Sequence, residues 1–366
     1  MSAARGPWRL GPNRVERFYR GGALLERFRG QPEPADGVRP EDWVGSTTRA
    51  WSAPGMPRTD DGLGVVEVDG RTVTLRELLE ADPAAVAGPA LVERAGVTTG
   101  LLVKLLDAAV RLPIHAHPTR SFARSKLGSF FGKTEAWIVL ATRQMPGAEP
   151  PVVRIGFNRD VERRELITLI DDERTEDLLA AMHLRPTAPG DTWFIPAGLP
   201  HAIGAGVFMI EIEEPADFSI VAETRGIPID RQSASLRLGW EVAVDAYDRT
   251  GWTAAAIDDL RHSPATLADR DGLRVQRLTG PAADPFFRAQ RVKVDGTVRP
   301  WSEEAFLVGV VTAGQGTASV ADSHVTLRAG ETFAVPAAGL PELRLDGRGL
   351  ELVACLPPRP ADIGAA

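Results

Sequence analysis

The sequence is poor in cysteine, in lysine and in long apolar runs. Its 366 residues include one cysteine, so an internal disulfide or a cluster of thiolate metal ligands is excluded. Cys355 lies in the apolar run 350–356, where we expect a buried, unreactive thiol. No run of about 18 apolar residues occurs, and the N-terminus lacks the apolar core of a signal peptide. We therefore expect a cytoplasmic protein with no membrane partner.

Composition and charge are those of an ordinary globular protein. Hydrophobic residues make up 43% of the chain and charged residues 25%, and the formal net charge is −7. No basic patch balances this negative charge, so we expect no nucleic-acid partner. The length predicts two or three domains at roughly 100–200 residues each, or one double-barrel protein.

Lysine and histidine are scarce, and they gather in one window. Of the 42 basic residues only four are lysines, and three of these lie between positions 104 and 133. Two of the six histidines, His115 and His117, fall in the same window. Chance in a small sample explains this clustering; so does a site that requires those side chains.

The composition and the residue pattern of the sequence change near residue 100. Residues before it are rich in Gly, Pro and Arg, with helical patterns over 14–29 and over 74–87, where Thr74 and Glu77 have capping-box spacing. After it, short β-branched segments recur between turn residues, which predicts an antiparallel sandwich or barrel. These segments are 101–106, 112–116, 136–141, 152–157, 192–195 and 207–212, with one helical interruption over 175–182.

Two segments of the chain resemble each other in sequence. Residues 189–201 and 329–342 both read as a Gly-acid turn, a strand, a Pro-Ala turn and the start of the next element. His201 in the first segment corresponds to Glu342 in the second, so we expect a duplicated barrel with metal chemistry in the first copy only. The predicted divisions are an N-terminal elaboration packing on the first barrel (1–99), a metal-binding barrel (100–224), a connector (225–285) and a degenerate second barrel (286–366).

Four residues have the chemistry of a metal site. His115 and His117 are two apart, so on a strand both imidazoles point to one face. Glu135 begins an apolar strand in which an unpaired carboxylate would be costly to bury. His201 follows a tight Pro-Gly-Pro turn. Three imidazoles and one carboxylate suit zinc, iron, manganese, cobalt or nickel, and the ligand types do not choose among these metals.

The motifs around these residues resemble the cupin superfamily, and more closely the class I (type I) mannose-6-phosphate isomerases of the short bacterial kind. The similarity covers nearly the whole chain. It is carried by Gly21-Gly22-x-Leu24…Phe28, Glu41-x-Trp43-x-x-Ser46, 102–108, His115-Ala116-His117-Pro118, Gly132-Lys133-Thr134-Glu135, 196–204 and Glu211-Ile212…Asp217.

The resemblance implies a mainly β protein of two cupin (jelly-roll) barrels, and a site that holds one divalent metal ion, usually zinc. Its metal ligands are His117, Glu135 and His201, with His115 where the family has glutamine. A second departure is Val221, which stands where the family has its catalytic arginine; Arg225 lies four residues further on.

The resemblance also implies an intramolecular oxidoreductase that interconverts mannose 6-phosphate and fructose 6-phosphate through an enediol. The candidate catalytic residues are Lys133, Glu213, Glu211 and Arg225, although a solvated strand or a salt bridge explains the two glutamates equally well. The candidate substrate-binding residues are Lys133, Arg120, Lys126 and Trp193.

Two alternatives remain open. One is an isomerase of the non-phosphorylated sugar, because an exposed basic face on a loop accounts for Arg120 better than a phosphate site does. The other is a cupin that binds a sugar, or uses iron and oxygen, without isomerising anything.

Overall fold

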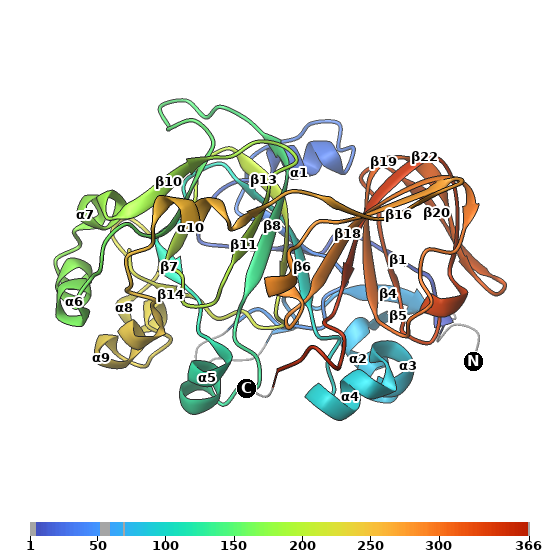
Figure 1. Cartoon of the computed structure of the whole chain (residues 1–366), viewed down its shortest axis with the longest axis horizontal. Helices are drawn as coiled ribbons and strands as arrows, with labels where there is room; N and C mark the ends of the chain where they lie inside the picture. The colour runs from blue at the N-terminus through green and yellow to red at the C-terminus, as the bar shows by residue number, and fades with distance from the viewer. Residues whose placement is uncertain (1–4, 52–58, 69, 365–366) are drawn as a thin grey trace.

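The chain is mainly β, as the sequence predicts. The computed structural model describes residues 5–51, 59–68 and 70–364. Figure 1 shows two β-rich halves side by side, the first built mostly from the green middle of the chain and the second from the orange and red C-terminal part. Within the described ranges, no helix is both long enough and apolar enough to cross a membrane.

Two antiparallel sheets build the first half, and residues of both sheets pack into one hydrophobic core. The larger sheet contains, in spatial order, β15 (Arg261–His262), β11 (Thr192–Ile195), β8 (Glu135–Thr142), β13 (Val207–Glu213), β6 (Leu102–Ala108), β3 (Glu41–Trp43) and β2 (Arg14–Val15). The smaller contains β10 (Met182–Pro186), β9 (Val152–Phe157), β12 (His201–Ile203), β7 (His115–Ala116) and β14 (Ile220–Val221).

One sheet forms the second half. Its order is β1 (Trp8–Leu10), β21 (Thr332–Val335), β19 (Leu307–Val320), β22 (Arg344–Leu356), β18 (Arg288–Val298), β17 (Leu273–Arg277) and β16 (Ala265–Arg270), and β20 (Ser323–Arg328) pairs with β19. The sheet thus includes β16 and β17, which lie in the segment predicted to be a connector (225–285). It also includes β1, from the N-terminal region. A separate hairpin joins β4 (Val65–Val68) to β5 (Arg71–Thr74).

The helices between the strands are short. They are α1 (Ala23–Phe28), α2 (Leu75–Ala81), α3 (Pro83–Ala87), α4 (Pro89–Ala95), α5 (Arg120–Phe122), α6 (Arg163–Asp171), α7 (Thr175–Ala180), α8 (Arg231–Ala234), α9 (Trp240–Ala243) and α10 (Ala254–Asp258). The predicted capping box is present, with Thr74 and Glu77 satisfying each other's backbone N–H groups.

Two of the sequence-based helix limits are wrong. The pattern over 14–29 predicts one helix, but only its last part, α1, is helical, because the chain first forms β2 and then passes through Gly22 at φ 113°. The pattern over 74–87 divides into α2 and α3 at Asp82, whose side chain caps α3 ahead of Pro83.

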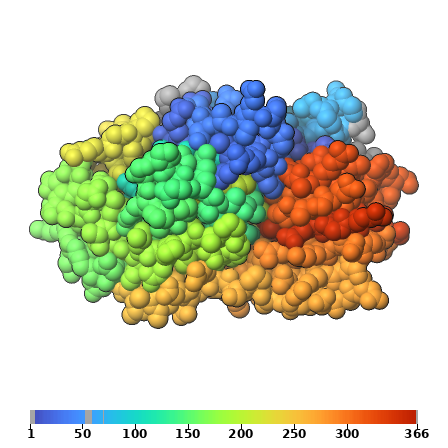
Figure 2. Space-filling model, turned by 90° about the horizontal axis from the view of Figure 1, so that it is seen from above, coloured from blue at the N-terminus to red at the C-terminus, as the bar shows by residue number. Residues whose placement is uncertain are grey.

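The N-terminal segment ties the two halves together. Arg29 donates hydrogen bonds to the Gly330 carbonyl oxygen (3.1 Å) and to Thr332 Oγ1 (3.0 Å) of the second half. Figure 2 shows this blue segment lying over the junction between the green and orange-red parts. One hydrophobic core spans both halves and includes Cys355, whose burial raises its pKa to about 12, as expected of an unreactive thiol.

Candidate metal centre

Three histidines from two neighbouring strands meet inside the first half. His115 lies on β7 directly opposite His201 on β12, and their ring centroids are 4.1 Å apart. The ring of His117, just after β7, lies 4.9 Å from that of His201. His201 is reached through a turn that is fixed to β7, because the Gly198 N–H donates to the His117 carbonyl oxygen at 2.7 Å. Gly198 has φ 91°, which favours glycine there.

Each imidazole is held in one tautomer by the backbone. The Nδ1 atoms lie 2.7–2.8 Å from the carbonyl oxygens of Pro113, Phe218 and Leu199, respectively for His115, His117 and His201. A carbonyl oxygen only accepts hydrogen bonds, so each Nδ1 carries the proton and each Nε2 carries a lone pair. Burial, the largest cause, lowers the pKa of all three imidazoles, which keeps them neutral. Neutral imidazoles oriented in this way are the form that binds metal ions.

Glu135 completes the group. Its Oε1 accepts a hydrogen bond from the Trp137 indole at 2.8 Å, and its Oε2 lies 3.0 Å from His117 Nε2. Burial acts to raise the pKa of Glu135, but the positive charges of Lys133 and Lys104 act to lower it, so the pKa is lowered and the carboxyl group is ionised.

The four side chains fit a divalent metal ion. Within the described part of the chain, neither His117 Nε2, His201 Nε2 nor Glu135 Oε2 has a hydrogen-bond partner, although all three atoms are buried. Two electron-rich atoms 3.0 Å apart, with no proton between them, repel each other unless a cation binds to both. Three imidazoles and a carboxylate are a donor set that zinc and its neighbours in the first transition row accept.

A buried network of charges surrounds these ligands. Lys104 on β6 pairs with Glu211 (3.1 Å) and Glu213 (3.0 Å) on β13, and Lys133 lies between Glu213 (3.1 Å) and Glu135 (3.6 Å). Burial and the neighbouring carboxylates raise the pKa of Glu213, while the two lysines act to lower it. Burial acts to lower the pKa of both lysines, but the carboxylates outweigh it and raise their pKa values, so both ammonium groups are charged.

The network extends to one arginine. Arg17 lies 3.2 Å from Glu41 and 3.3 Å from Asp217. Together the two groups of ion pairs hold five carboxylates and three cationic side chains. Carboxylates therefore outnumber cationic side chains in this network, which favours a bound cation and agrees with the unsatisfied lone pairs on the ligands.

The structure brings together seven of the residues that the sequence singles out. They are His115, His117, Glu135, His201, Lys133, Glu211 and Glu213. Glu211 and Glu213 are two residues apart on β13, so their side chains point to the same face of the sheet. That face carries Lys104 and the metal centre. The alternative of a solvated strand for these glutamates is wrong, since both side chains are buried in ion pairs.

Four predicted site residues lie elsewhere. Arg225 is exposed and pairs with Glu173. Arg120 is bound to Glu214 at 2.6 Å and to the carbonyl oxygen of Pro285. Lys126 lies exposed in the short π-helix Ala123–Leu127, and Trp193 is fully buried with its indole N–H donated to Thr187. Among the described residues, none of the hydrogen bonds and ion pairs named here for these four residues is made to a histidine of the metal centre.

Sequence reasoning missed Arg17 and gave Lys104 no role. Arg17 is one of many arginines in a segment whose pattern predicts a helix, so no local signal marks it. Lys104 carries a signal in its scarcity and in its place on an apolar strand, because a lysine there must find a buried partner.

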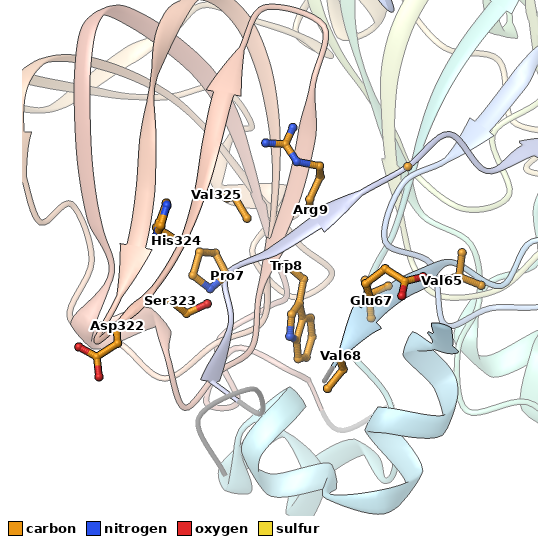
Figure 3. Close-up of a pocket in the computed structure, with 12 residues that line it drawn as sticks. Pro7, Trp8, Arg9, Val65, Glu67, Val68, Asp322, Ser323, His324 and Val325 are labelled. Atoms are coloured by element: carbon orange, nitrogen blue, oxygen red, sulfur yellow. The ribbon is translucent and has the colours of Figure 1, made fainter. Parts of the chain in front are cut away.

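A cavity of about 470 Å³ lies in the first half of the structure. Its lining includes Arg17, Asp217, Ser219 and Val221. A second cavity, of about 730 Å³, lies far from the histidines. Figure 3 shows it between β1, the hairpin strand β4 and the loop before β20, with Arg9, Glu67 and His324 around it. It contains no ligand of the metal centre.

Comparison with known proteins connects this site to a family. No protein-family model matches the sequence. The mannose-6-phosphate isomerase of Streptococcus mutans is 29% identical over 240 residues, which are 64% of this chain and 68% of that protein. A Bacillus subtilis protein, YvyI, named as a candidate mannose-6-phosphate isomerase, is 25% identical over 345 residues, which are 94% of this chain and 96% of that protein.

Solved structures agree in fold. The mannose 6-phosphate isomerase of Bacillus subtilis superposes with a TM-score of 0.70 at 22% identity, covering 95% of this chain and 99% of that one. A zinc-bound mannose 6-phosphate isomerase superposes with a TM-score of 0.69 at 16% identity, covering 96% and 100%. The resemblance seen in the motifs is therefore confirmed: the chain is similar in sequence to proteins named mannose-6-phosphate isomerase and shares the fold of the solved ones.

Proposed function

We propose that the protein is a metal-dependent aldose–ketose isomerase that interconverts mannose 6-phosphate and fructose 6-phosphate. The observation that carries this proposal is the convergence of three tautomer-fixed imidazoles and Glu135 in a fold shared with proteins of that name. We assign zinc as the metal, because the donor set suits it and a zinc-bound isomerase has the same fold.

His115, His117, Glu135 and His201 would hold the ion. When bound there, zinc supplies a Lewis acid that polarises the sugar carbonyl. Glu135 also accepts from Trp137, and the imidazoles donate to fixed carbonyl groups, so the protein holds its donors in place before the ion binds. We also propose that residues 286–366 act as a support, since both clusters of potential metal ligands found among the described residues lie in the first half.

Isomerisation moves one proton between adjacent carbons. A base removes the C2 proton of the open-chain aldose, the released electron pair forms the C1–C2 double bond, and O1 is protonated. O2 then loses its proton and C1 gains one, which gives the ketose. We assign this proton transfer to Lys133 and Glu213, which are 3.1 Å apart beside ligand Glu135, with Glu211 held in the same network through Lys104.

The roles of the outlying residues change accordingly. Arg120 joins the first half to the connector through Glu214 and Pro285, and Arg225 pairs on the surface with Glu173, so we assign both to structure. Trp193 belongs to the buried core. Lys126 remains our candidate for contact with the phosphate group, because it is exposed on the loop between His117 and Lys133.

The test is isomerase activity with and without metal. Zinc-loaded protein is incubated with mannose 6-phosphate and, separately, with mannose, and the ketose products are measured before and after treatment with a chelator. We expect chelator-sensitive turnover of the phosphorylated sugar. Turnover of free mannose alone would show that the substrate is the non-phosphorylated sugar. Turnover of neither sugar would refute the proposed reaction. His201→Ala should bind less zinc; Glu342→Ala, at the corresponding position of the second half, should bind the full amount.

A further inference from the structure

Strand β14 joins the metal centre to the 470 Å³ cavity. Val221 on β14 is directly opposite His115 on β7 in an antiparallel pair. Opposite residues in such a pair direct their side chains to the same face, so Val221 lies on the face of the sheet that carries the ligand His115. Val221, Ser219 and Asp217 all line the cavity. Strand β14 therefore places a residue of the cavity lining directly opposite the ligand His115, on the same face of the sheet.

Arg17 provides the positive charge of this cavity. Among the described residues that line it, Arg17 is the one cationic side chain; Glu16, Asp217 and Asp230 are acidic. Strand β14 itself supplies no cation, because its two residues are Ile220 and Val221. Arg17 comes instead from the N-terminal segment just after β2 and enters the cavity from a different part of the chain.

The guanidinium group of Arg17 is held on two sides. Its Nη1 donates to Asp217 Oδ2 at 3.3 Å, and its Nε lies 3.2 Å from Glu41 Oε1. Glu41 is itself fixed by hydrogen bonds from Tyr19 (2.6 Å) and Trp43 (2.8 Å). The Arg17 side chain is 17% exposed, against 3% for Glu41 and 4% for Asp217. No described residue accepts a hydrogen bond from Nη2, which leaves that edge for the cavity.

We propose that Arg17 contacts the substrate, donating hydrogen bonds from its Nη2 edge to oxygen atoms of the open-chain sugar bound between the cavity and the metal centre. This inference rests on the proposed function. Two carboxylates offset the charge of the guanidinium, and the other acidic side chains of the cavity repel anions. The group therefore suits the neutral hydroxyl and carbonyl oxygens of the sugar chain, and the phosphate group lies elsewhere.

The competing explanation is that Arg17 only neutralises Glu41 and Asp217. Arg29 is a matched control, because it also comes from the N-terminal segment, is 7% exposed and binds a buried carboxylate, Asp42, through Nε (3.0 Å) and Nη2 (2.6 Å). Arg29 does not line the cavity. A purely structural role predicts that loss of either arginine lowers stability and leaves turnover by the folded, zinc-loaded protein unchanged.

The experiment compares zinc-loaded Arg17→Gln, Arg17→Lys and Arg29→Gln with the wild type, with zinc content and folding measured for each. We expect kcat/KM of Arg17→Gln to fall about 100-fold, as for loss of one preorganised donor. Arg17→Lys retains the charge needed for folding but lacks the fork-shaped donor, so it should be impaired less. Arg29→Gln should keep wild-type kcat and KM. Guanidinium ion at millimolar concentration should restore part of the activity of Arg17→Ala.

Two outcomes would overturn the inference. One is an Arg17→Gln protein that contains full zinc and has kcat/KM within about threefold of the wild type. The other is a rise in the inhibition constant of inorganic phosphate in the Arg17 variants, which would move the contact from the sugar oxygens to the phosphate. A wild type that turns over neither sugar would instead refute the proposed function, so the two failures are distinguishable.

Discussion

Replacement of Lys104 by methionine should destabilise the protein strongly. The Lys104 side chain is 2% exposed, and its Nζ lies 3.1 Å from Glu211 and 3.0 Å from Glu213, over the ring of Trp43. Methionine fills nearly the same volume but leaves both carboxylates without this counterion. Loss of one partner of a buried ion pair costs about 3–5 kcal/mol, because the remaining charge cannot be solvated. We expect the free energy of unfolding to fall by about that amount.

Lys293 provides the matched control. Its Nζ lies 2.8 Å from Glu351, so the contact is shorter than either contact of Lys104, but the lysine side chain is 54% exposed. A surface ion pair contributes about 0–1 kcal/mol, so Lys293→Met should be nearly neutral. Urea unfolding of both variants in the presence of a chelator measures the difference. Equal destabilisation of the two variants would refute our account of the buried network.

A further variant separates charge from packing. In Lys104→Met combined with Glu211→Gln and Glu213→Gln, the buried charges are removed along with their counterion. We expect this triple variant to be more stable than Lys104→Met alone, because the cost of the single change comes from buried carboxylates that have lost the charge of Lys104. A triple variant less stable than the single one would instead assign the effect to lost packing around Trp43.

Three other outcomes follow from the same site. Zinc at about 100 times its dissociation constant should raise the free energy of unfolding, measured by urea unfolding, by about 2.7 kcal/mol, and His117→Ala should abolish this gain. Lys133→Met should retain zinc while kcat falls about 100-fold or more in a coupled isomerase assay. Arg17, Lys104 and Lys133 outweigh burial and lower the pKa of Asp217, so its ionised form stabilises the fold above the unfolded-state pKa of about 3.9. The destabilisation by Asp217→Asn, measured by urea unfolding, should therefore be present at pH 7 and shrink as the pH falls below about 4.

The sequence is most informative where local geometry fixes direction. The spacing of His115 and His117 places both imidazoles on one face of any strand, and the parity of Glu211 and Glu213 does the same. The register of the strands that brings His201 opposite His115 is a long-range property. It became predictable only because the motifs resemble those of a known fold.

Long-range pairing also explains what the sequence could not supply. Arg17 reaches Asp217 across 200 positions of the chain, and nothing near Arg17 in the sequence encodes that contact. Arg120 shows the opposite error: a cation beside a predicted site was assigned to phosphate binding, but Glu214, 94 positions away, already binds it. Local charge predicts a site only when the partners of that charge are known.

The scarcity of lysine now has a physical reason at two positions. Lys104 and Lys133 each lie between two buried carboxylates, at distances of 3.0–3.6 Å. A compact ammonium group can donate to several oxygens around it, whereas the planar guanidinium of arginine is wider and directs its donors within one plane. The chain uses arginine for most of its exposed ion pairs, and at these two positions it has lysine, where a buried point charge must fit between carboxylates beside the metal ligands.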